Sequence, residues 1–200
     1  MFIIKYAQYV CGWFIVSKVI YRLFKHQNSK WKNNLISFLN AFLISGSIAR
    51  ELYYNIPASQ NAYYYYSGVG YFLFDMKNYP VYSTYWTHHI LSIVLIASVQ
   101  NQTDIILDDP RNLLFVFEFG NLPMYLVYGL LTSIHNSRWK KNKLLKIFMI
   151  FEFIWFSFFR CVVPFMFIPN IHHLYKLGAL IIILGSFKWA ISILNNINKQ

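Results

Sequence analysis

Four ionisable residues that could do chemistry together interrupt the apolar segments of this 200-residue chain: Asp75, His88, His89 and Glu118. A carboxylate beside an imidazole is a working arrangement in acid–base and nucleophilic catalysis. Histidine pairs are poor packing residues, which favours a functional interpretation of this set. We therefore predict that these residues form a catalytic site. The alternative is that they pair across helices and only fix the packing.

The two histidines cannot easily share one metal ion, because adjacent residues on a helix point about 100° apart. One imidazole can face a cavity while the other holds the helix in place. Ser92 follows His88 by four residues and His89 by three, so its hydroxyl lies within helical reach of either ring. We predict no metal site and no bound cofactor.

A second set of polar residues recurs at steps of three and four: Glu118, Asn121, Tyr125, Tyr128 and Thr132. This spacing draws one polar stripe down an otherwise apolar helix, and the stripe should face inward. Pro123 lies within the stripe, so we expect a kink and freed backbone carbonyls near Glu118.

Three more ionisable residues lie in later apolar segments. Glu152 and Arg160 are two helical turns apart, Arg160 precedes Pro164 by one turn, and Lys188 stands in the last segment. Such residues usually face a bundle interior or a wet cavity, although pairing across helices is an open alternative for these three. The residues that we expect to line a substrate cavity are Tyr71, Ser92, Asn121, Tyr125 and Arg160.

The elements that must position these residues are membrane helices. The chain is 57% hydrophobic and only 12% charged, with a mean hydropathy of +0.38, whereas a soluble domain carries roughly 25% charged residues. Cys11 and Cys161 both lie in apolar segments without zinc or redox spacing. We predict an all-α, polytopic membrane bundle with the spans 6–24, 34–52, 60–76, 85–100, 112–134, 145–168 and 172–194.

Basic residues set the expected topology. Eleven Lys and Arg residues fall in one set of alternate loops, and only Lys5, Arg50, Arg111 and Lys176 fall in the other. The positive-inside rule then puts the N-terminus in a lumen and the C-terminus in the cytosol. If the first segment merely lies on the surface, six spans remain and the later loops keep their sides. Asn101-Gln102-Thr103 is a glycosylation sequon on the expected lumenal side.

Three strings carry a resemblance to a known family. Gly70-Tyr71-Phe72-Leu73-Phe74-Asp75 is followed by Trp86-Thr87-His88-His89-Ile90-Leu91-Ser92, and later by Glu118-Phe119-Gly120-Asn121-Leu122-Pro123. Together with Phe159-Arg160 and Pro164 they resemble the TLC domain, which is shared by translocating-chain-associating membrane proteins, ceramide synthases and a ceroid lipofuscinosis protein. The resemblance covers residues 34–195, after a first span and a basic cytosolic loop over residues 1–33.

The resemblance implies a fold, an activity and a location. Members of this family have about six helices in a ring around a lipid-sized cavity, with the histidine pair inside. Ceramide synthases join an acyl group from acyl-CoA to a sphingoid amine, and the family implies residence in the endoplasmic reticulum or a related endomembrane. This chain departs from the ceramide-synthase pattern, because Asp104, Asp108 and Asp109 lie in a predicted loop. The match is therefore to the broader family.

Two functions follow as alternatives. The first is acyl transfer from acyl-CoA, as co-substrate, to a lipid amine or hydroxyl, with one histidine as nucleophile or base and Asp75 or Glu118 orienting it. The second is non-catalytic lipid binding in membrane homeostasis or trafficking. Either would make membrane lipids the partners and exclude nucleic acid, because the net charge of +11 gathers beside span ends. Six histidines are too few for a di-iron hydroxylase.

Overall fold

The computed structural model describes residues 2–56, 63–81, 83–99, 108–133, 143–170 and 173–198, and these residues are helical with short connections. The described α-helices are α1 (Phe2–Leu23), α2 (Ser29–Tyr53), α3 (Tyr63–Asp75), α4 (Thr84–Val99), α5 (Asp108–Thr132), α7 (Lys143–Ser157) and α8 (His173–Asn198). Each predicted span thus overlaps one α-helix, and the 145–168 span ends in π-helical and 3₁₀-helical turns. The sequon at Asn101, the loop residue Asp104 and the basic residues Arg138, Lys140 and Lys141 lie outside the described residues.

Four of the described helical stretches are long and apolar enough to cross a membrane: Ser29–Tyr53, Arg111–Thr132, Lys143–Met166 and Lys176–Asn198. The α1 helix is not among them. At 1.5 Å per residue, α3 and α4 measure about 20 and 24 Å, less than the roughly 30 Å of bilayer hydrocarbon. The chain is therefore an all-helical protein with four candidate membrane-spanning helices among the described residues.

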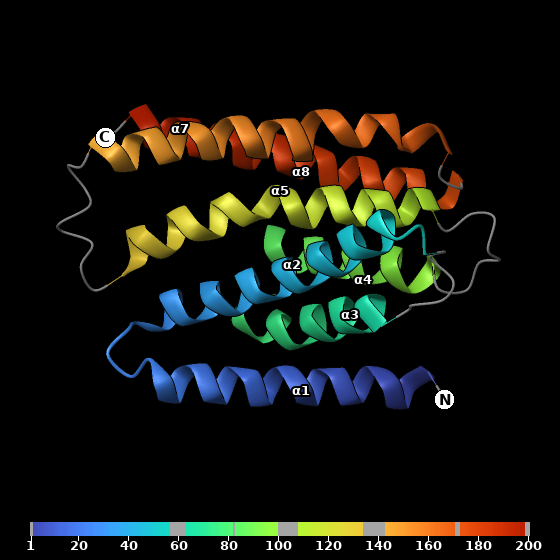
Figure 1. Cartoon of the computed structure of the whole chain (residues 1–200), viewed down its shortest axis with the longest axis horizontal. Coiled ribbons are helices and arrows are strands. Elements are labelled where there is room, and N and C mark those ends of the chain that lie inside the picture. The colour runs from blue at the N-terminus through green and yellow to red at the C-terminus, as the bar shows by residue number, and fades with distance from the viewer. Residues whose placement is uncertain are drawn as a thin grey trace.

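The helices lie lengthwise beside one another, and successive helices run in opposite directions (Figure 1). The N-terminus and the C-terminus lie at opposite ends of the bundle. Contacts between helices follow the order α2, α3, α4, α8, α7, α5 and back to α2, while α1 contacts α3 and α2 from outside this cycle. Residues of α3, α4, α5 and α8 also line one inner cavity, which is described below.

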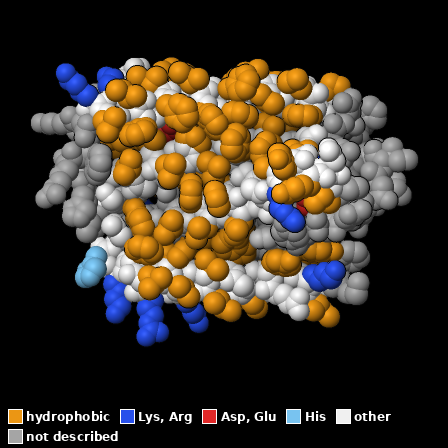
Figure 2. Space-filling model, in the orientation of Figure 1, with side chains coloured by type: hydrophobic (Ala, Val, Ile, Leu, Met, Phe, Trp, Pro, Cys, Tyr) orange, Lys and Arg blue, Asp and Glu red, His pale blue; other side chains and the backbone are white. Residues whose placement is uncertain are grey.

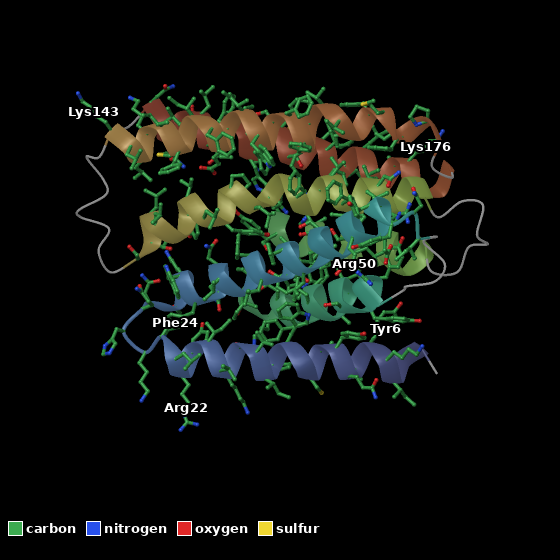
Figure 3. The ribbon with its side chains drawn as sticks, in the orientation of Figure 1. Tyr6, Arg22, Phe24, Arg50, Lys143 and Lys176 are labelled. Carbon is green, nitrogen blue, oxygen red and sulfur yellow. The ribbon has the colours of Figure 1, made fainter. Side chains whose placement is uncertain are left out.

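The surface has the polarity expected of a membrane protein. Hydrophobic side chains cover much of the visible face in Figure 2. Figure 3 shows Arg22 and Lys143 at one end of the bundle, with Arg50 and Lys176 at the other. Arg22 and Lys143, which the sequence predicts to lie on one side of the membrane, share one end of the molecule, and Arg50 and Lys176 share the other (Figure 3).

Two polar residues near the start of α2 connect it to α5. Asn28 caps α2, because its Oδ1 accepts a hydrogen bond of 2.8 Å from the backbone N–H of Trp31. Its Nδ2 donates to the carbonyl of Thr132 at the end of α5. Asn34 Nδ2 donates to the carbonyl of Tyr125 at 2.6 Å. These hydrogen bonds fix the position of α2 along the axis of α5.

The carbonyl that the sequence predicts Pro123 to free is that of Phe119 on α5, and it bonds to another helix. Proline lacks the N–H that would bond to Phe119, four residues earlier. Trp155 on α7 donates its indole N–H to that carbonyl at 3.1 Å. After α7 the chain forms a π-helical turn, Phe158–Val162, and then a 3₁₀ turn, Val163–Met166. Wide turns of this kind frequently occur at functional sites, and this one holds Arg160.

Candidate functional site

His89 is fixed by hydrogen bonds at both ring nitrogens. Its Nδ1 donates to the carbonyl of Tyr85, one turn earlier, at 2.8 Å. Its Nε2 lies 3.0 Å from Oδ2 of Asp75 at the end of α3. Since a carbonyl can only accept, Nδ1 carries a hydrogen, and Nε2 is occupied by its contact with the carboxyl group. No nitrogen of His89 is left to act on a substrate.

Asp75 is held from several sides. The Tyr71 hydroxyl lies 3.1 Å from Asp75 Oδ2 and 2.7 Å from the Ser37 hydroxyl on α2. Asn78 Nδ2 donates to Asp75 Oδ1 at 2.6 Å. Asp75 and His89 are 3% and 5% exposed. This hydrogen-bonded group, which we call the Asp75 network, therefore connects α2, α3 and α4 in the protein interior.

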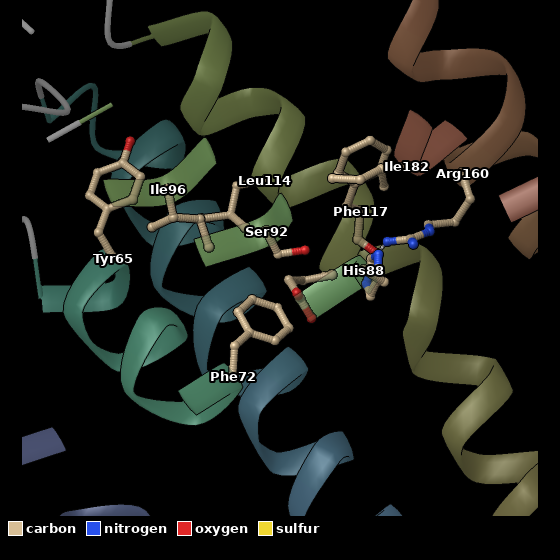
Figure 4. A pocket seen from close by; sticks show the side chains of 10 residues that line it. Tyr65, Phe72, His88, Ser92, Ile96, Leu114, Phe117, Arg160 and Ile182 are labelled. Carbon is tan, nitrogen blue, oxygen red and sulfur yellow. Dashed lines mark hydrogen bonds between the residues drawn. The ribbon is translucent and has the colours of Figure 1, made fainter. Parts of the chain in front are cut away.

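His88 points to a different place, an inner cavity of about 30 Å³. The polar side chains that line it are His88, Ser92, Glu118 and Arg160. Its apolar lining is Tyr65, Phe72, Ile96, Leu114, Phe117 and Ile182. Figure 4 shows His88 beside the Arg160 guanidinium, while Tyr65 and Ile96 lie at the far end of the cavity. The volume is roughly that of one or two water positions.

Arg160 is 1% exposed and only partly satisfied. Its Nη1 donates to the carbonyl of Phe117 at 3.2 Å, whereas Nε and Nη2 have no hydrogen-bond partner among the described residues. Glu118, 5% exposed, lines the same cavity but forms no ion pair with Arg160 within the described part of the chain. Buried donors without partners are costly, so the cavity is suited to a ligand that offers acceptor oxygens.

A second opening reaches His88 from outside. The lateral groove, about 420 Å³, lies between α4 and α8 and is lined by Thr84, Thr87, His88, Leu91, Ile181, Ile182, Leu184, Gly185, Lys188 and Trp189. His88 and Ile182 line both the groove and the inner cavity. The indole ring of Trp189 packs edge-on against His88, with centroids 5.1 Å apart. The described residues provide His88 with no hydrogen bond, so its ring nitrogens are available to a ligand.

Tyr125 and Tyr128, which belong to the polar stripe on α5, face a third space. A polar vestibule of about 390 Å³ is lined by Lys30, Asn33, Asn34, Ser37, Asn78, Tyr79, Tyr85, Met124, Tyr125 and Tyr128. Ser37 and Asn78 also belong to the Asp75 network, so the vestibule borders it. Burial raises the pKa of Tyr79 far above its usual range, and the Asp75 charge adds to this. Tyr79 therefore stays a neutral hydrogen-bonding group.

The remaining candidates are separated from the inner cavity. Asn121 is buried with no partner for Oδ1 among the described residues, but it does not line that cavity. Glu152, 5% exposed, lines a separate pocket of about 170 Å³ with Ser192 and Asn196. Lys188 is exposed at the lateral groove.

The structure therefore divides the four predicted catalytic residues into two groups. Asp75 and His89 bind each other, while His88 and Glu118 line the inner cavity. Of the five expected cavity residues, Ser92 and Arg160 line that cavity, Tyr71 joins the Asp75 network and Tyr125 lines the vestibule. Sequence reasoning missed Ser37, Asn78 and Trp189. Two features of the sequence could have pointed to Asn78 and Trp189. Asn78 follows Asp75 by three residues, and Trp189 is the neighbour of Lys188 in an apolar segment.

Among the described residues, no three His, Cys, Asp or Glu side chains gather where they could hold a metal ion. No protein-family model, curated protein or solved structure matches this chain. The resemblance to the TLC domain therefore stays a prediction from the motifs quoted above.

Proposed function

We propose that this chain is a multi-pass membrane protein of the TLC type that transfers an acyl group from acyl-CoA to a lipid amine or hydroxyl. One observation carries the proposal. His88, free of hydrogen bonds within the described residues, lies where the lateral groove meets a buried cavity that holds Glu118, Ser92 and unpartnered Arg160 donors. A membrane lipid could reach the imidazole through the groove.

The proposed chemistry gives roles to His88 and Arg160. The acceptor nitrogen or oxygen attacks the thioester carbonyl while His88 takes its proton as general base. Nε and Nη2 of Arg160 donate to the carbonyl oxygen as negative charge develops there. The carbon–sulfur bond then breaks, and the proton passes from His88 to the CoA thiolate. In this scheme His89 and Asp75 are positioning residues, since their hydrogen bonds hold α4 against α3.

The proposal includes an arrangement in the membrane. The cyclic order of contacts among α2, α3, α4, α8, α7 and α5 supports six helices around one interior. The alternating helix directions support a crossing by all seven helices, with neighbouring helices completing the short crossings of α3 and α4. Under this topology the polar vestibule, with Lys30, opens toward the cytosol, where it could meet the phosphates of CoA. The endoplasmic reticulum or a related endomembrane is the proposed location.

The alternative function is non-catalytic lipid binding. The lateral groove would hold the lipid, with His88 donating a hydrogen bond to its headgroup and one headgroup oxygen reaching the Arg160 donors in the inner cavity. This alternative needs no proton transfer, so it predicts weaker lipid retention and no lost product when His88 is replaced.

Lipid mass spectrometry of membranes supplied with labelled acyl-CoA separates the two functions. Membranes would carry the wild type, His88→Ala or His26→Ala, a matched control because His26 is exposed and outside the site. We expect a labelled amide or ester with the wild type and the control, and a loss of at least about 100-fold with His88→Ala, the usual contribution of a general base. If no labelled product forms and an unmodified lipid co-purifies with the wild type and the control but less with His88→Ala, the binding function is correct.

A further inference from the structure

The lateral groove is amphipathic along its length. At one end it presents Thr84, Thr87 and Lys188, and at the other Leu91, Ile181 and Leu184. Its volume of about 420 Å³ falls in the range of sites for small molecules. The groove therefore offers hydrogen-bond donors and a positive charge at one end and hydrocarbon contacts at the other.

The polar and apolar ends are aligned on both helices. The α4 and α8 helices are antiparallel, and the start of α4 faces the end of the bundle at which α8 ends (Figure 1). From Thr84 to Leu91 and from Lys188 to Ile181 the chain covers seven residues, about 10 Å of rise. Because the helices are antiparallel, both steps lead away from that end. The groove thus changes from polar to apolar with depth, as a lipid does from its headgroup to its chain.

Lys188 needs an anionic partner more than the other exposed lysines do. It stands inside the Lys176–Asn198 stretch, which is apolar enough to cross a membrane, and an ammonium group at such a position is costly when unpaired. None of the described residues forms an ion pair with it. Trp189, the next residue, also lines the groove, and indole rings prefer the headgroup level of a membrane.

We propose that the lateral groove binds an anionic phospholipid of the surrounding membrane. The lipid phosphate accepts hydrogen bonds from the Lys188 ammonium and from the hydroxyls of Thr84 and Thr87, and one acyl chain lies along Leu91, Ile181 and Leu184. This proposal does not depend on acyl transfer, since it concerns occupancy of the groove in the resting protein. A lipid bound there would close the outer approach to His88.

Quenching of tryptophan fluorescence by brominated lipids tests the proposal in the full-length protein reconstituted into vesicles. One set of vesicles contains dibromostearoyl phosphatidylglycerol and the other contains phosphatidylcholine with the same chains. The part of the quenching that is lost in Trp189→Phe comes from Trp189 and therefore measures brominated lipid in the groove. We expect the wild type to prefer phosphatidylglycerol in this component, and Lys188→Gln to lower the preference by about fivefold, the usual effect of one basic residue at an anionic surface.

Lys146→Gln is the matched control, because Lys146 is exposed on α7 and belongs to the same predicted side of the membrane. It should keep the preference of the wild type. Equal losses in Lys188→Gln and Lys146→Gln would mean attraction to the membrane surface as a whole and would overturn the proposal. Equal quenching of the wild type by the two lipids would overturn it too. Neither outcome bears on acyl transfer, which the labelled acyl-CoA assay measures separately.

Discussion

The two neighbouring histidines have opposite surroundings. Both ring nitrogens of His89 bind groups of the protein, the Tyr85 carbonyl and the Asp75 carboxyl group. His88 keeps both nitrogens for the inner cavity and the lateral groove. Their rings are 5.8 Å apart with an interplanar angle of 78°, so one cannot replace the other. A function test that removes both histidines together would mix loss of chemistry with loss of structure.

A double-mutant cycle checks the structural role of His89. His89→Ala and Asp75→Ala each leave a buried polar partner without its bond, whereas the double variant removes both groups. We expect the sum of the two single losses of unfolding free energy to exceed the loss in the double variant by about 1–3 kcal/mol. The measurement is SDS-induced unfolding in mixed micelles.

The cycle has an internal control in His88→Ala combined with Asp75→Ala. Because no hydrogen bond joins His88 to Asp75 among the described residues, those effects should add within about 0.5 kcal/mol. Additive effects for His89 with Asp75 would show that the 3.0 Å contact contributes nothing to stability.

At the scale of elements, the inner cavity depends on a close crossing between α5 and the turn that carries Arg160. Gly120 on α5 has no side chain, and a Cβ there would lie 2.9 Å from Arg160 Cγ and 3.0 Å from Phe159 Cβ. Trp155 packs near the same crossing through its bond to the Phe119 carbonyl. A small residue at position 120 thus lets the guanidinium reach the cavity.

Gly120→Ala should displace Arg160 and destabilise the fold by about 1–3 kcal/mol, the usual cost of overpacking. The same variant should lose acyl transfer in the labelled acyl-CoA assay, because Arg160 no longer reaches the carbonyl oxygen. Gly178→Ala is the control, since nothing lies within 4 Å of a Cβ built there. It should be neutral or slightly stabilising, as expected for Gly to Ala in a helix. Similar stability of the two variants would contradict the close crossing.

At the scale of the whole molecule, basic residues lie at both ends of the helical bundle. Arg22 and Lys143 lie at one end and Arg50 and Lys176 at the other (Figure 3). Hydrophobic side chains spread over the surface between these ends (Figure 2). This distribution is what a bundle needs when its long axis crosses the bilayer.

Cysteine labelling tests whether the short α3 crosses with the others. Lys25 precedes α2 and Lys77 follows α3, while Arg50 lies in the last turn of α2, at the end that leads to α3. The variants are Lys25→Cys, Lys77→Cys and Arg50→Cys. In sealed vesicles of a variant without Cys11 and Cys161, an impermeant maleimide should label positions 25 and 77 from one side and position 50 from the other. If position 77 is labelled from the same side as position 50, then α3 does not cross.

The sequence by itself determined the helical class, the approximate place of each helix and the carbonyl freed one turn before Pro123. These follow from local properties, namely runs of apolar residues and the missing N–H of proline. It also identified His88, His89, Asp75 and Glu118 as a set, because ionisable residues are rare in apolar segments. It could not divide that set, since both histidines stand on one helix and either could have faced the carboxylate of Asp75.

Only the tertiary structure decided which of the two imidazole rings is hydrogen-bonded to protein groups. The rotation of α4 about its axis depends on its packing against α3 and α8, which brings His89 to Asp75 and His88 to Trp189. The same holds for Arg160, whose π-helical turn and neighbour Gly120 set its reach. Contacts between residues distant in the chain fix these orientations, and no periodicity within one segment encodes them.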